Sequence, residues 1–318
     1  MKKVACVGIL VADVMASPVD SVPERGMLSQ VNAITVHSGG NAMTASINLT
    51  KMGVDAKIVG KVGSDMFGMY LRDCLKKAGV DTRALKEDDT VQTSASVVLS
   101  ESSGERSFLH CVGTNAVFSV NDIDFDVIDE CDLVFVTGSF LMNTFDGKET
   151  ADFLKKCKEK GKTTFLDVCW DAKGQWGKVL DCCLPYLDFF MPSIDEAVQL
   201  AGGETDPERI ADVFMNKGTK NVIIKLGSKG SFLRLSGEDK GNIYPIVGRQ
   251  KPVDTTGAGD SFCSGFLAAY ARDAEPHECM MVANATGGLC TMAKGATTGT
   301  KSYEETIRFL NEELGVRS

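Results

Sequence analysis

The segment from Asp254 to Asp260 has residue types and a spacing suited to acid–base chemistry beside a bound anion. It reads Asp-Thr-Thr-Gly-Ala-Gly-Asp, and after it Phe262, Phe266 and Tyr270 recur at helical spacing. The glycines are therefore predicted to lie at a helix N-terminus, where free backbone N–H groups and the helix dipole bind anions. Asp260 would lie in the first turn, where a carboxylate can take a proton from a hydroxyl. A capped helix without chemistry explains this segment alone equally well.

A second glycine-rich segment, Ser38-Gly39-Gly40-Asn41-Ala42, is predicted to open a helix that ends at Met52-Gly53. Its backbone could form a cradle for a polar ligand, because glycine allows close approach. A loop that only starts a helix is the simpler explanation of this segment taken by itself.

Short apolar runs alternate with helical patterns along the chain. The helical segment Phe67–Ala78 ends at Gly79, and another begins at Asp206-Pro207 and ends at Gly218. The predicted strands are Val4–Leu10, Lys57–Val62, Leu133–Thr137, Thr163–Asp167, Phe189–Met191 and Asn221–Leu226. Such alternation predicts an α/β fold with a mostly parallel central sheet and helices on both faces. Ligands bind beyond the carboxyl ends of strands in such sheets, which places Asp13 near a site.

Two stretches break this alternation and predict a small second sheet. Ser29–Val36 and Thr93–Cys111 look like strands without intervening helices, and a turn at 102–105 separates Ser96–Ser100 from Arg106–Cys111. We expect residues 1–318 to form one domain, with a small β-sheet lid contributed by roughly 14–37 and 93–112. Exposed strand edges tend to find partners, so the lid is also the expected interface of a homodimer.

Composition restricts the class of protein. The net charge of −9 and the pI near 5.0 argue against binding to nucleic acid. Eleven cysteines without a C-x-x-C pair, and only three histidines, argue against structural zinc and indicate reduced thiols in a cytoplasmic protein. The start of the chain imitates a signal peptide, but its apolar run is short and predicts a first buried strand. No apolar stretch approaches the ~20 residues that span a bilayer, so no membrane association is expected.

Together these segments resemble the ribokinase-like carbohydrate kinases, the PfkB family. The resemblance rests on the Asp254–Asp260 segment, on Gly39-Gly40-Asn41, and on Gly60-Lys61-Val62-Gly63-Ser64-Asp65-Met66-Phe67-Gly68, and its features run from Asp13 to Gly295. No P-loop and no dinucleotide-binding glycine turn competes with it. The resemblance implies a ribokinase-like fold and an ATP-dependent phosphotransferase that uses Mg²⁺ and, in many members, K⁺.

The resemblance also implies roles for individual residues. Asp260 would be the base that activates a sugar hydroxyl, and the amides of Gly257, Ala258 and Gly259 would bind the γ-phosphate. The expected sugar-binding residues are Asp13, Gly39, Gly40 and Asn41. The expected nucleotide-binding residues are Ser193, Lys225, Gly227, Ser228, Gly230 and Asn284, with Asn284 near the adenine. Glu196 would organise Mg²⁺ through water, and Asp254 and Thr256 would hold a monovalent cation, with carbonyls from Cys290, Ala293 and Gly295.

Several positions depart from the family pattern. The usual Asn-x-x-Glu is Ser193-Ile194-Asp195-Glu196 here, and Thr44 replaces a common asparagine. Many sugar-acid kinases carry Asp-x-Asn-x-Arg after a central strand, whereas this chain has Asp167-Val168-Cys169-Trp170-Asp171. An acid in place of the arginine would disfavour an anionic substrate, although Lys173 is near in sequence.

The sequence therefore predicts a kinase that phosphorylates a primary hydroxyl of a small neutral sugar or polyol. A nucleoside kinase of the same fold is a second interpretation, for which Phe108 is the main aromatic residue in the lid. A sugar-acid kinase of the 2-keto-3-deoxygluconate type is a third. A sugar-binding protein without turnover is the fourth. Trp170 and Trp176 are candidates to flank a ligand or to fill the core, and His110 is a candidate pocket residue in the lid.

Overall fold

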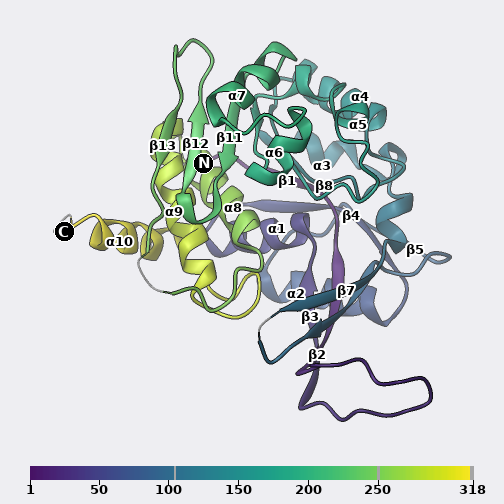
Figure 1. Cartoon of the computed structure of the whole chain (residues 1–318). Helices are drawn as coiled ribbons and strands as arrows, with labels where there is room; N and C mark the ends of the chain where they lie inside the picture. Colours follow the sequence, from purple (N-terminus) through teal and green to yellow (C-terminus); the bar gives the residue numbers. More distant parts are fainter. Residues whose placement is uncertain (104, 249–250, 316–318) are drawn as a thin grey trace.

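The computed structural model describes residues 1–103, 105–248 and 251–315, and their strands form two sheets (Figure 1). The larger sheet has nine strands in the order β13-β12-β11-β10-β9-β8-β1-β4-β5. Neighbours are parallel except at β12, which is antiparallel to both of its neighbours. In chain order these strands are β1 Val4–Gly8, β4 Ala56–Gly63, β5 Leu85–Asp88, β8 Leu133–Ser139, β9 Thr163–Val168, β10 Phe189–Phe190, β11 Asn221–Lys225, β12 Ser231–Arg234 and β13 Asn242–Tyr244.

Helices cover both faces of this sheet, as the sequence predicted. One core lies under α1 Asn41–Lys51, α2 Met66–Ala78, α8 Ala258–Tyr270, α9 Pro276–Thr291 and α10 Tyr303–Glu313. The other lies under α3 Phe125–Asp129, α4 Lys148–Glu159, α5 Gly177–Leu180, α6 Ile194–Leu200 and α7 Pro207–Asn216. Strand β1 serves both cores, because Val4 and Cys6 point into the first and Ala5 and Val7 into the second. None of the helices in the described ranges is long and apolar enough to cross a membrane.

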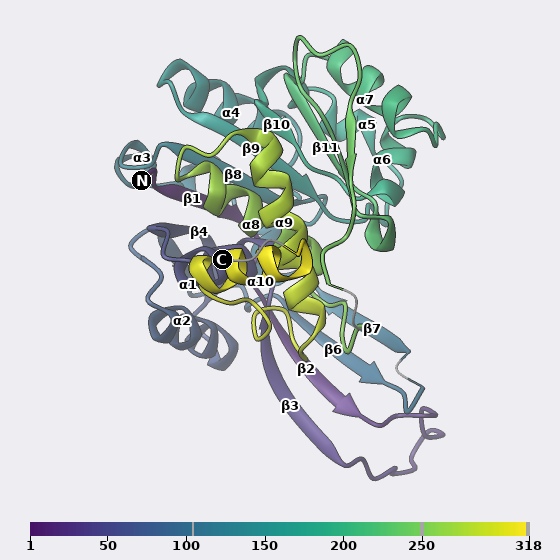
Figure 2. The same ribbon diagram turned by 90° about the vertical axis from the view of Figure 1, so that its left-hand side faces the viewer.

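The smaller sheet, which we call the lid, has the order β3-β2-β6-β7. Its strands are β2 Val11–Ser17, β3 Ala33–Gly39, β6 Ala95–Ser100 and β7 Arg106–Cys111. Figure 2 shows it projecting from the body as a curved sheet. The hairpin of β6 and β7 confirms the strand pair predicted around the turn at 102–105.

Some predicted boundaries were wrong. The first strand was expected to reach Leu10, but β1 ends at Gly8 and the chain enters lid strand β2 at Val11, earlier than residue 14. A Cβ on Gly8 would lie 1.9 Å from the carbonyl oxygen of Thr137, so only glycine lets β1 and β8 approach here. The strand expected at Ser29–Val36 is β3, which begins at Ala33. Strands β5, β12 and β13 were not predicted.

The helix ends follow local chemistry. Asp206 caps α7 by accepting the N–H groups of Glu208 and Arg209, which confirms the predicted start of that helix. Gly79 ends α2 in the left-handed conformation, as expected from its position after Ala78. Single-turn 3₁₀ segments complete the connections: η1 Gly113–Val117, η2 Val120–Asp122, η3 Leu184–Tyr186 and η4 Gly227–Lys229.

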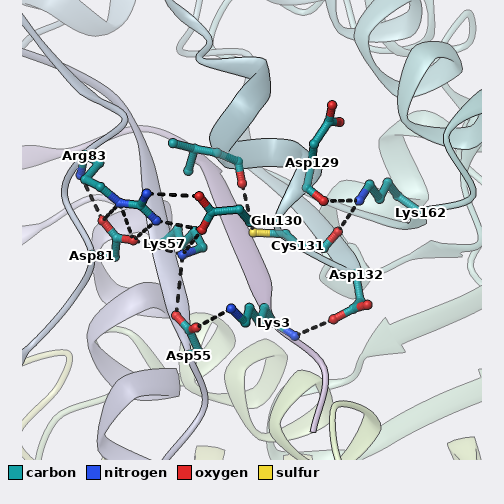
Figure 3. A network of polar contacts seen from close by, with 11 residues as sticks. Lys3, Asp55, Lys57, Asp81, Arg83, Asp129, Glu130, Cys131, Asp132 and Lys162 are labelled. Carbon is teal, nitrogen blue, oxygen red and sulfur yellow. Dashed lines mark hydrogen bonds and ion pairs between the residues drawn. The ribbon is translucent and has the colours of Figure 1, made fainter.

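A network of ion pairs lies at the amino ends of β1, β4 and β8 (Figure 3). At its centre Lys57, with a side chain only 3% exposed, lies 2.9 Å from Asp81 and 3.0 Å from Glu130. Arg83 bridges the same two carboxylates. Because functional sites of parallel sheets lie at the carboxyl ends, this network serves the fold rather than a site.

Replacing Lys57 with methionine is expected to lower the free energy of unfolding by about 1–3 kcal/mol, because hydrogen bonds to two carboxylates are lost. Lys77→Met is the matched control. Its ion pair with Asp73 is exposed to solvent, so its loss should change the free energy of unfolding much less. Urea unfolding of both variants measures the difference, and equal losses would contradict this account of the network.

Candidate active site

The helix α8 begins where the sequence predicted an anion site. Gly257 is its N-cap with φ +75°, and a Cβ there would lie 2.4 Å from the Cβ of Ala296. No side chain caps the first turn. The N–H of Ala258 donates to the carbonyl oxygen of Thr255 at 3.2 Å, so the other amides of the turn are the ones available to a ligand. Asp260 lies in this first turn, beside those amides. The expected juxtaposition of a carboxylate and an anion-binding backbone is therefore present.

These residues line a cavity of about 610 Å³ at the carboxyl ends of β9 and β11. The cavity collects most of the residues expected in the catalytic and nucleotide sites from distant parts of the chain. Its wall consists of Asn41, Asp167, Val168, Cys169, Trp170, Ser193, Ile194, Asp195, Glu196, Lys225, Leu226, Gly227, Ser228, Thr255, Gly257, Ala258, Gly259 and Asp260. A volume of this size suits a small-molecule site.

Asn41, the first residue of α1, holds the carboxylate of Asp260. Its Nδ2 donates a hydrogen bond of 2.7 Å to Asp260 Oδ1. The thiol of Cys169, at the end of β9, donates in turn to Asn41 Oδ1 at 3.1 Å. Burial raises the pKa of Asp260, and the charge of Lys225 and the bond from Asn41 oppose that rise. The carboxylate is thus oriented and poorly solvated, as a general base should be.

Lys225 and Asp167 form a buried ion pair in the floor of the cavity. Lys225 Nζ lies 2.6 Å from Asp167 Oδ2, and the two side chains are 13% and 2% exposed. Burial alone would lower the pKa of Lys225, but the carboxylates of Asp167 and Glu196 raise it, so the ammonium stays charged. The sequence predicted Lys225 as part of a nucleotide loop. In the structure it ends β11 just before η4, and its Nζ lies beside the N-terminus of α8.

Four of the residues predicted around the donor's phosphates and metal also line the cavity: Ser193, Glu196, Gly227 and Ser228. Ser193 caps α6, and its backbone N–H donates to Glu196 Oε2 at 2.8 Å. Burial raises the pKa of Glu196, which the charge of Lys225 opposes. Gly227 and Ser228 in η4 also line the cavity. In the described ranges no three acidic, histidine or cysteine side chains converge as direct metal ligands.

Two residues expected to bind the nucleotide do not line the cavity. Asn284 is 7% exposed, and its Nδ2 donates to Ser231 Oγ at 3.0 Å. A Cβ on Gly230 would lie 2.0 Å from the carbonyl oxygen of Tyr244. The close packing at Gly230 therefore explains a glycine there without a ligand.

The residues expected to bind sugar lie where the lid joins the body. Gly40 adopts φ +90° against the backbone of Ile9, and it directs the chain from β3 into α1 at Asn41. A Cβ on Gly39 would lie 2.2 Å from Asp13 Oδ2, so the carboxylate of Asp13 rests against a glycine backbone. Burial raises the pKa of Asp13, and Ser96, His110 and His37 oppose that rise.

Asp13 belongs to a row of four polar residues across the lid. Strand register pairs His37 with Asp13, Asp13 with Ser96, and Ser96 with His110, so all four side chains face the same side. Ser96 Oγ and His110 Nδ1 lie 3.1 Å apart, which ties His110 to this row. The two histidines of the lid therefore flank the carboxylate that was predicted to bind sugar.

The residues predicted to hold a monovalent cation are engaged with a side chain of the lid. Arg106 Nη2 lies 3.0 Å from Asp254 Oδ1, and Arg106 also donates to Thr256 Oγ1. Burial alone would raise the pKa of Asp254, but the N–H groups of Gly295 and Thr256 and the guanidinium of Arg106 lower it to about 2. In this conformation a guanidinium supplies the positive charge at Asp254.

The argument that Asp171 repels an anionic substrate was wrong. Its carboxylate is 5% exposed and accepts the backbone N–H groups of Lys173, Gln175 and Trp176. Asp171 therefore stabilises its own loop and does not line the cavity. Of the two tryptophans, Trp170 is 55% exposed and lines the cavity, whereas Trp176 packs edge-on against Phe140.

Sequence reasoning missed several residues of the site. Asp167 was quoted only as part of a motif, and Cys169, Ser96 and Arg106 were given no role. Asp167 is the last residue of a strand predicted from the sequence. Because ligands bind beyond the carboxyl ends of such strands, this position could have identified it as a site residue. Arg106 had no such signal, because its partners are 148 and 150 residues away.

Comparison with known proteins places this geometry in a family. The model of the pfkB family carbohydrate kinases matches residues 1–302. A fructokinase of Vibrio alginolyticus is 27% identical over 308 residues, which cover 92% of this chain and 96% of that protein. A 2-dehydro-3-deoxygluconokinase of Bacillus subtilis (strain 168) is 26% identical over 302 residues, with 92% of each covered.

Comparison with solved structures gives a matching result for the fold. The solved structure of Arabidopsis thaliana ribokinase complexed with ribose and ATP aligns with a TM-score of 0.85 at 24% identity, covering 97% of this chain and 98% of that one. The fold is therefore ribokinase-like, with a mostly parallel central sheet and a separate lid. The chain belongs to the pfkB family of carbohydrate kinases, and it is a sugar kinase.

Proposed function

We propose that this kinase transfers the γ-phosphoryl group of ATP to a primary hydroxyl of a small neutral sugar or polyol. The observation that carries the proposal is Asp260, oriented by Asn41 in the first turn of α8 beside uncapped amides. The related Arabidopsis ribokinase structure holds ribose and ATP, which supports the same pair of ligands here.

In this mechanism Asp260 takes the proton of the acceptor hydroxyl as its oxygen attacks the γ-phosphorus. The new O–P bond forms while the bond from the γ-phosphorus to the β–γ bridging oxygen breaks, and that electron pair leaves with ADP. The amides of Gly257, Ala258 and Gly259 stabilise the charge on the transferring group. Ser193, Lys225, Gly227 and Ser228 line the donor side.

The charge of the cavity supports a requirement for Mg²⁺. Acidic side chains at 167, 195, 196 and 260 face one lysine, so a polyphosphate would meet net negative charge. Glu196 would hold Mg²⁺ through water, and the ion would supply the missing positive charge. Asn284 and Gly230 would contribute through the packing of the adenine end of the site rather than through the cavity wall.

Asp254 and Thr256 remain the proposed site for K⁺, with Arg106 as the competing charge. A cation there would stabilise the loop that leads into Gly257. Rates measured in KCl and in tetramethylammonium chloride at equal ionic strength test this assignment.

Asp13, with Gly39, Gly40 and Asn41, is proposed to bind the acceptor. A carboxylate accepts hydrogen bonds from neighbouring hydroxyls, and the negative charge of Asp13 would disfavour an anionic acceptor. This replaces the argument from Asp171, and it favours a neutral sugar over a sugar acid.

Replacing Asp13 with asparagine is expected to raise the KM for the acceptor by about 10- to 100-fold, which corresponds to hydrogen bonds to a charged group. The KM for ATP should stay within about twofold and serves as the internal control. An unchanged acceptor KM would remove Asp13 from the site.

The lid is proposed to close over the acceptor and exclude water, and to form a homodimer interface. On the face opposite the Asp13 row, Val36, Val14, Val97 and Leu109 are in register across the sheet. Leu109 is 67% and Val97 41% exposed, so this face is apolar and uncovered. A second copy is the proposed partner, and a monomer mass in solution would contradict it.

Residues 1–318 are proposed to act as one cytoplasmic kinase domain, whose lid consists of β2, β3, β6 and β7. The test is ADP release with ATP, Mg²⁺ and K⁺ across ketohexoses, aldohexoses, pentoses, polyols, sugar acids and nucleosides. One strong hit among the neutral sugars or polyols, absent in Asp260→Asn, supports the proposal, and a sugar-acid hit would contradict the acceptor class.

A nucleoside acceptor is the second candidate, because one aromatic side chain is placed for stacking. Phe108 is 62% exposed and lines a cavity of about 380 Å³ with Arg106 and the loop from Pro252 to Thr255. Preference for adenosine or inosine over free sugars in the same panel would favour this candidate.

A further inference from the structure

The cavity contains one positive side chain for a substrate that carries several negative charges. Among the described residues that line it, Lys225 is the only cation, and it faces Asp167, Asp195, Glu196 and Asp260. Coulomb interactions are strong in such a poorly solvated site, so the position of this ammonium matters for any bound phosphate.

The ammonium of Lys225 is held in a fixed position. Asp167 Oδ2 accepts its hydrogen bond at 2.6 Å, while Asp167 Oδ1 accepts the backbone N–H of Val168 at 2.9 Å. Both oxygens of the carboxylate are thus anchored, and the lysine is the last residue of a buried strand. An ammonium has three N–H donors. One donates to Asp167, and a second makes a long contact of 3.9 Å with Cys263 Sγ, a weak acceptor that a phosphoryl oxygen can replace.

The ammonium also lies beside the helix N-terminus. A Cβ built on Gly259 would be 3.6 Å from Lys225 Nζ, so the charge approaches the backbone of the α8 first turn. A side chain at position 259 would occupy the space between the ammonium and the amides. The backbone at Gly259 and the ammonium therefore face one volume, next to the carboxylate of Asp260.

A buried ion pair is by itself weak evidence for a stabilising role, because desolvation offsets most of the attraction. The pair instead resembles a preorganised charge, which stabilises a transition state without reorganisation at the moment of reaction. Phosphoryl oxygens bound by the amides would receive charge-assisted hydrogen bonds from the remaining N–H donors.

We propose that Lys225 is a catalytic residue that contacts the γ-phosphoryl group during transfer, and that Asp167 is the positioning residue that directs its ammonium toward Gly259. This rests on the proposed function. It goes beyond a general part in nucleotide binding, because it assigns Lys225 to the group that is transferred. The lysine keeps its proton throughout, and the acceptor proton goes to Asp260.

The proposal predicts that Lys225 distinguishes a triphosphate from a diphosphate. In Lys225→Met, calorimetry should show the affinity for Mg²⁺-adenylyl imidodiphosphate, a non-hydrolysable ATP analogue, falling about tenfold or more. The affinity for Mg²⁺-ADP should stay within about twofold. With the acceptor, kcat should fall about 100- to 1000-fold, the range seen when one preorganised donor is removed.

Lys57→Met is the matched control, because Lys57 is also a buried lysine paired with carboxylates in the same sheet (Figure 3). It lies at the opposite ends of the strands and should leave both affinities and kcat within about twofold. Lys225→Arg should restore part of kcat, since it keeps the charge. Asp167→Asn should lower the affinity for the ATP analogue and leave the affinity for Mg²⁺-ADP unchanged. It replaces Lys225→Met in the test if that variant does not fold.

Parallel losses of analogue and ADP affinity, or no loss of either, would overturn the proposal. The binding comparison needs no acceptor, so its result is separable from that of the kinase panel. Loss of the analogue preference in Lys225→Met, alongside a panel without turnover, would leave the phosphate contact standing and reject the proposed function.

Discussion

Replacing Asp260 with asparagine is expected to lower kcat by about 10³- to 10⁴-fold, because the amide cannot take the acceptor proton. Asparagine keeps the shape of the side chain and an oxygen that accepts from Asn41 Nδ2. ATP affinity should stay within a few fold, which separates loss of the base from loss of the site. Steady-state kinetics of the variant measure this effect, and a kcat within tenfold of wild type would contradict the assignment.

The raised pKa of Asp260 also predicts the stability of this variant and the pH dependence of the wild-type enzyme. Burial makes the folded protein bind the Asp260 proton more tightly than the unfolded chain, so this carboxylate costs stability at neutral pH. Asp260→Asn should therefore be at least as stable as wild type. For the wild type, kcat should fall as pH drops through the raised pKa of Asp260, at a higher pH than an ordinary carboxyl group with a pKa of 3.8.

Replacing Gly257 with alanine is expected to lower kcat by about 100-fold or more, because it displaces the amides that bind the transferring group. Gly257 has φ +75°, and the added Cβ would meet the backbone of Ala296 at 2.6 Å. The left-handed conformation also destabilises the folded state by about 1–2 kcal/mol when the residue has a Cβ. Kinetics and thermal unfolding of the variant measure the two effects separately.

Gly161→Ala is the matched control for this change. Gly161 has φ +73°, but a Cβ there would meet nothing within 4 Å, and it follows α4 away from the cavity. Gly161→Ala should lower the free energy of unfolding by a similar conformational contribution, and its kcat should equal that of the wild type. Equal kcat in the two alanine variants would mean that the amides after Gly257 do not bind the transferring group.

The sequence predicted the features that depend on local chemistry. Glycines before a helical pattern placed Asp260 in the first turn of α8, and a proline after Asp206 located the start of α7. Alternation of apolar runs and helical patterns gave the main parallel strands and the layers around them. These features follow from backbone geometry within a few residues, so one sequence contains the necessary signal.

The features it missed depend on contacts between distant residues. Asn41 and Asp260 are 219 positions apart, and Lys225 and Asp167 are 58 apart, so no spacing rule could pair them. Asp171 matched a motif position, yet its carboxylate accepts hydrogen bonds from backbone N–H groups of its own loop. A motif gives a residue type and a neighbourhood, but the direction of a side chain is decided by the packing around it.

The most direct test of the central claim follows the γ-phosphorus of ATP by ³¹P NMR in the presence of the best acceptor from the panel. We expect one phosphomonoester for each ADP, with its signal split into a triplet by the methylene protons of a primary alcohol. Asp260→Asn should form both products about 10³- to 10⁴-fold more slowly. Inorganic phosphate in place of the ester, or a doublet from a secondary alcohol, would contradict the proposed transfer to a primary hydroxyl.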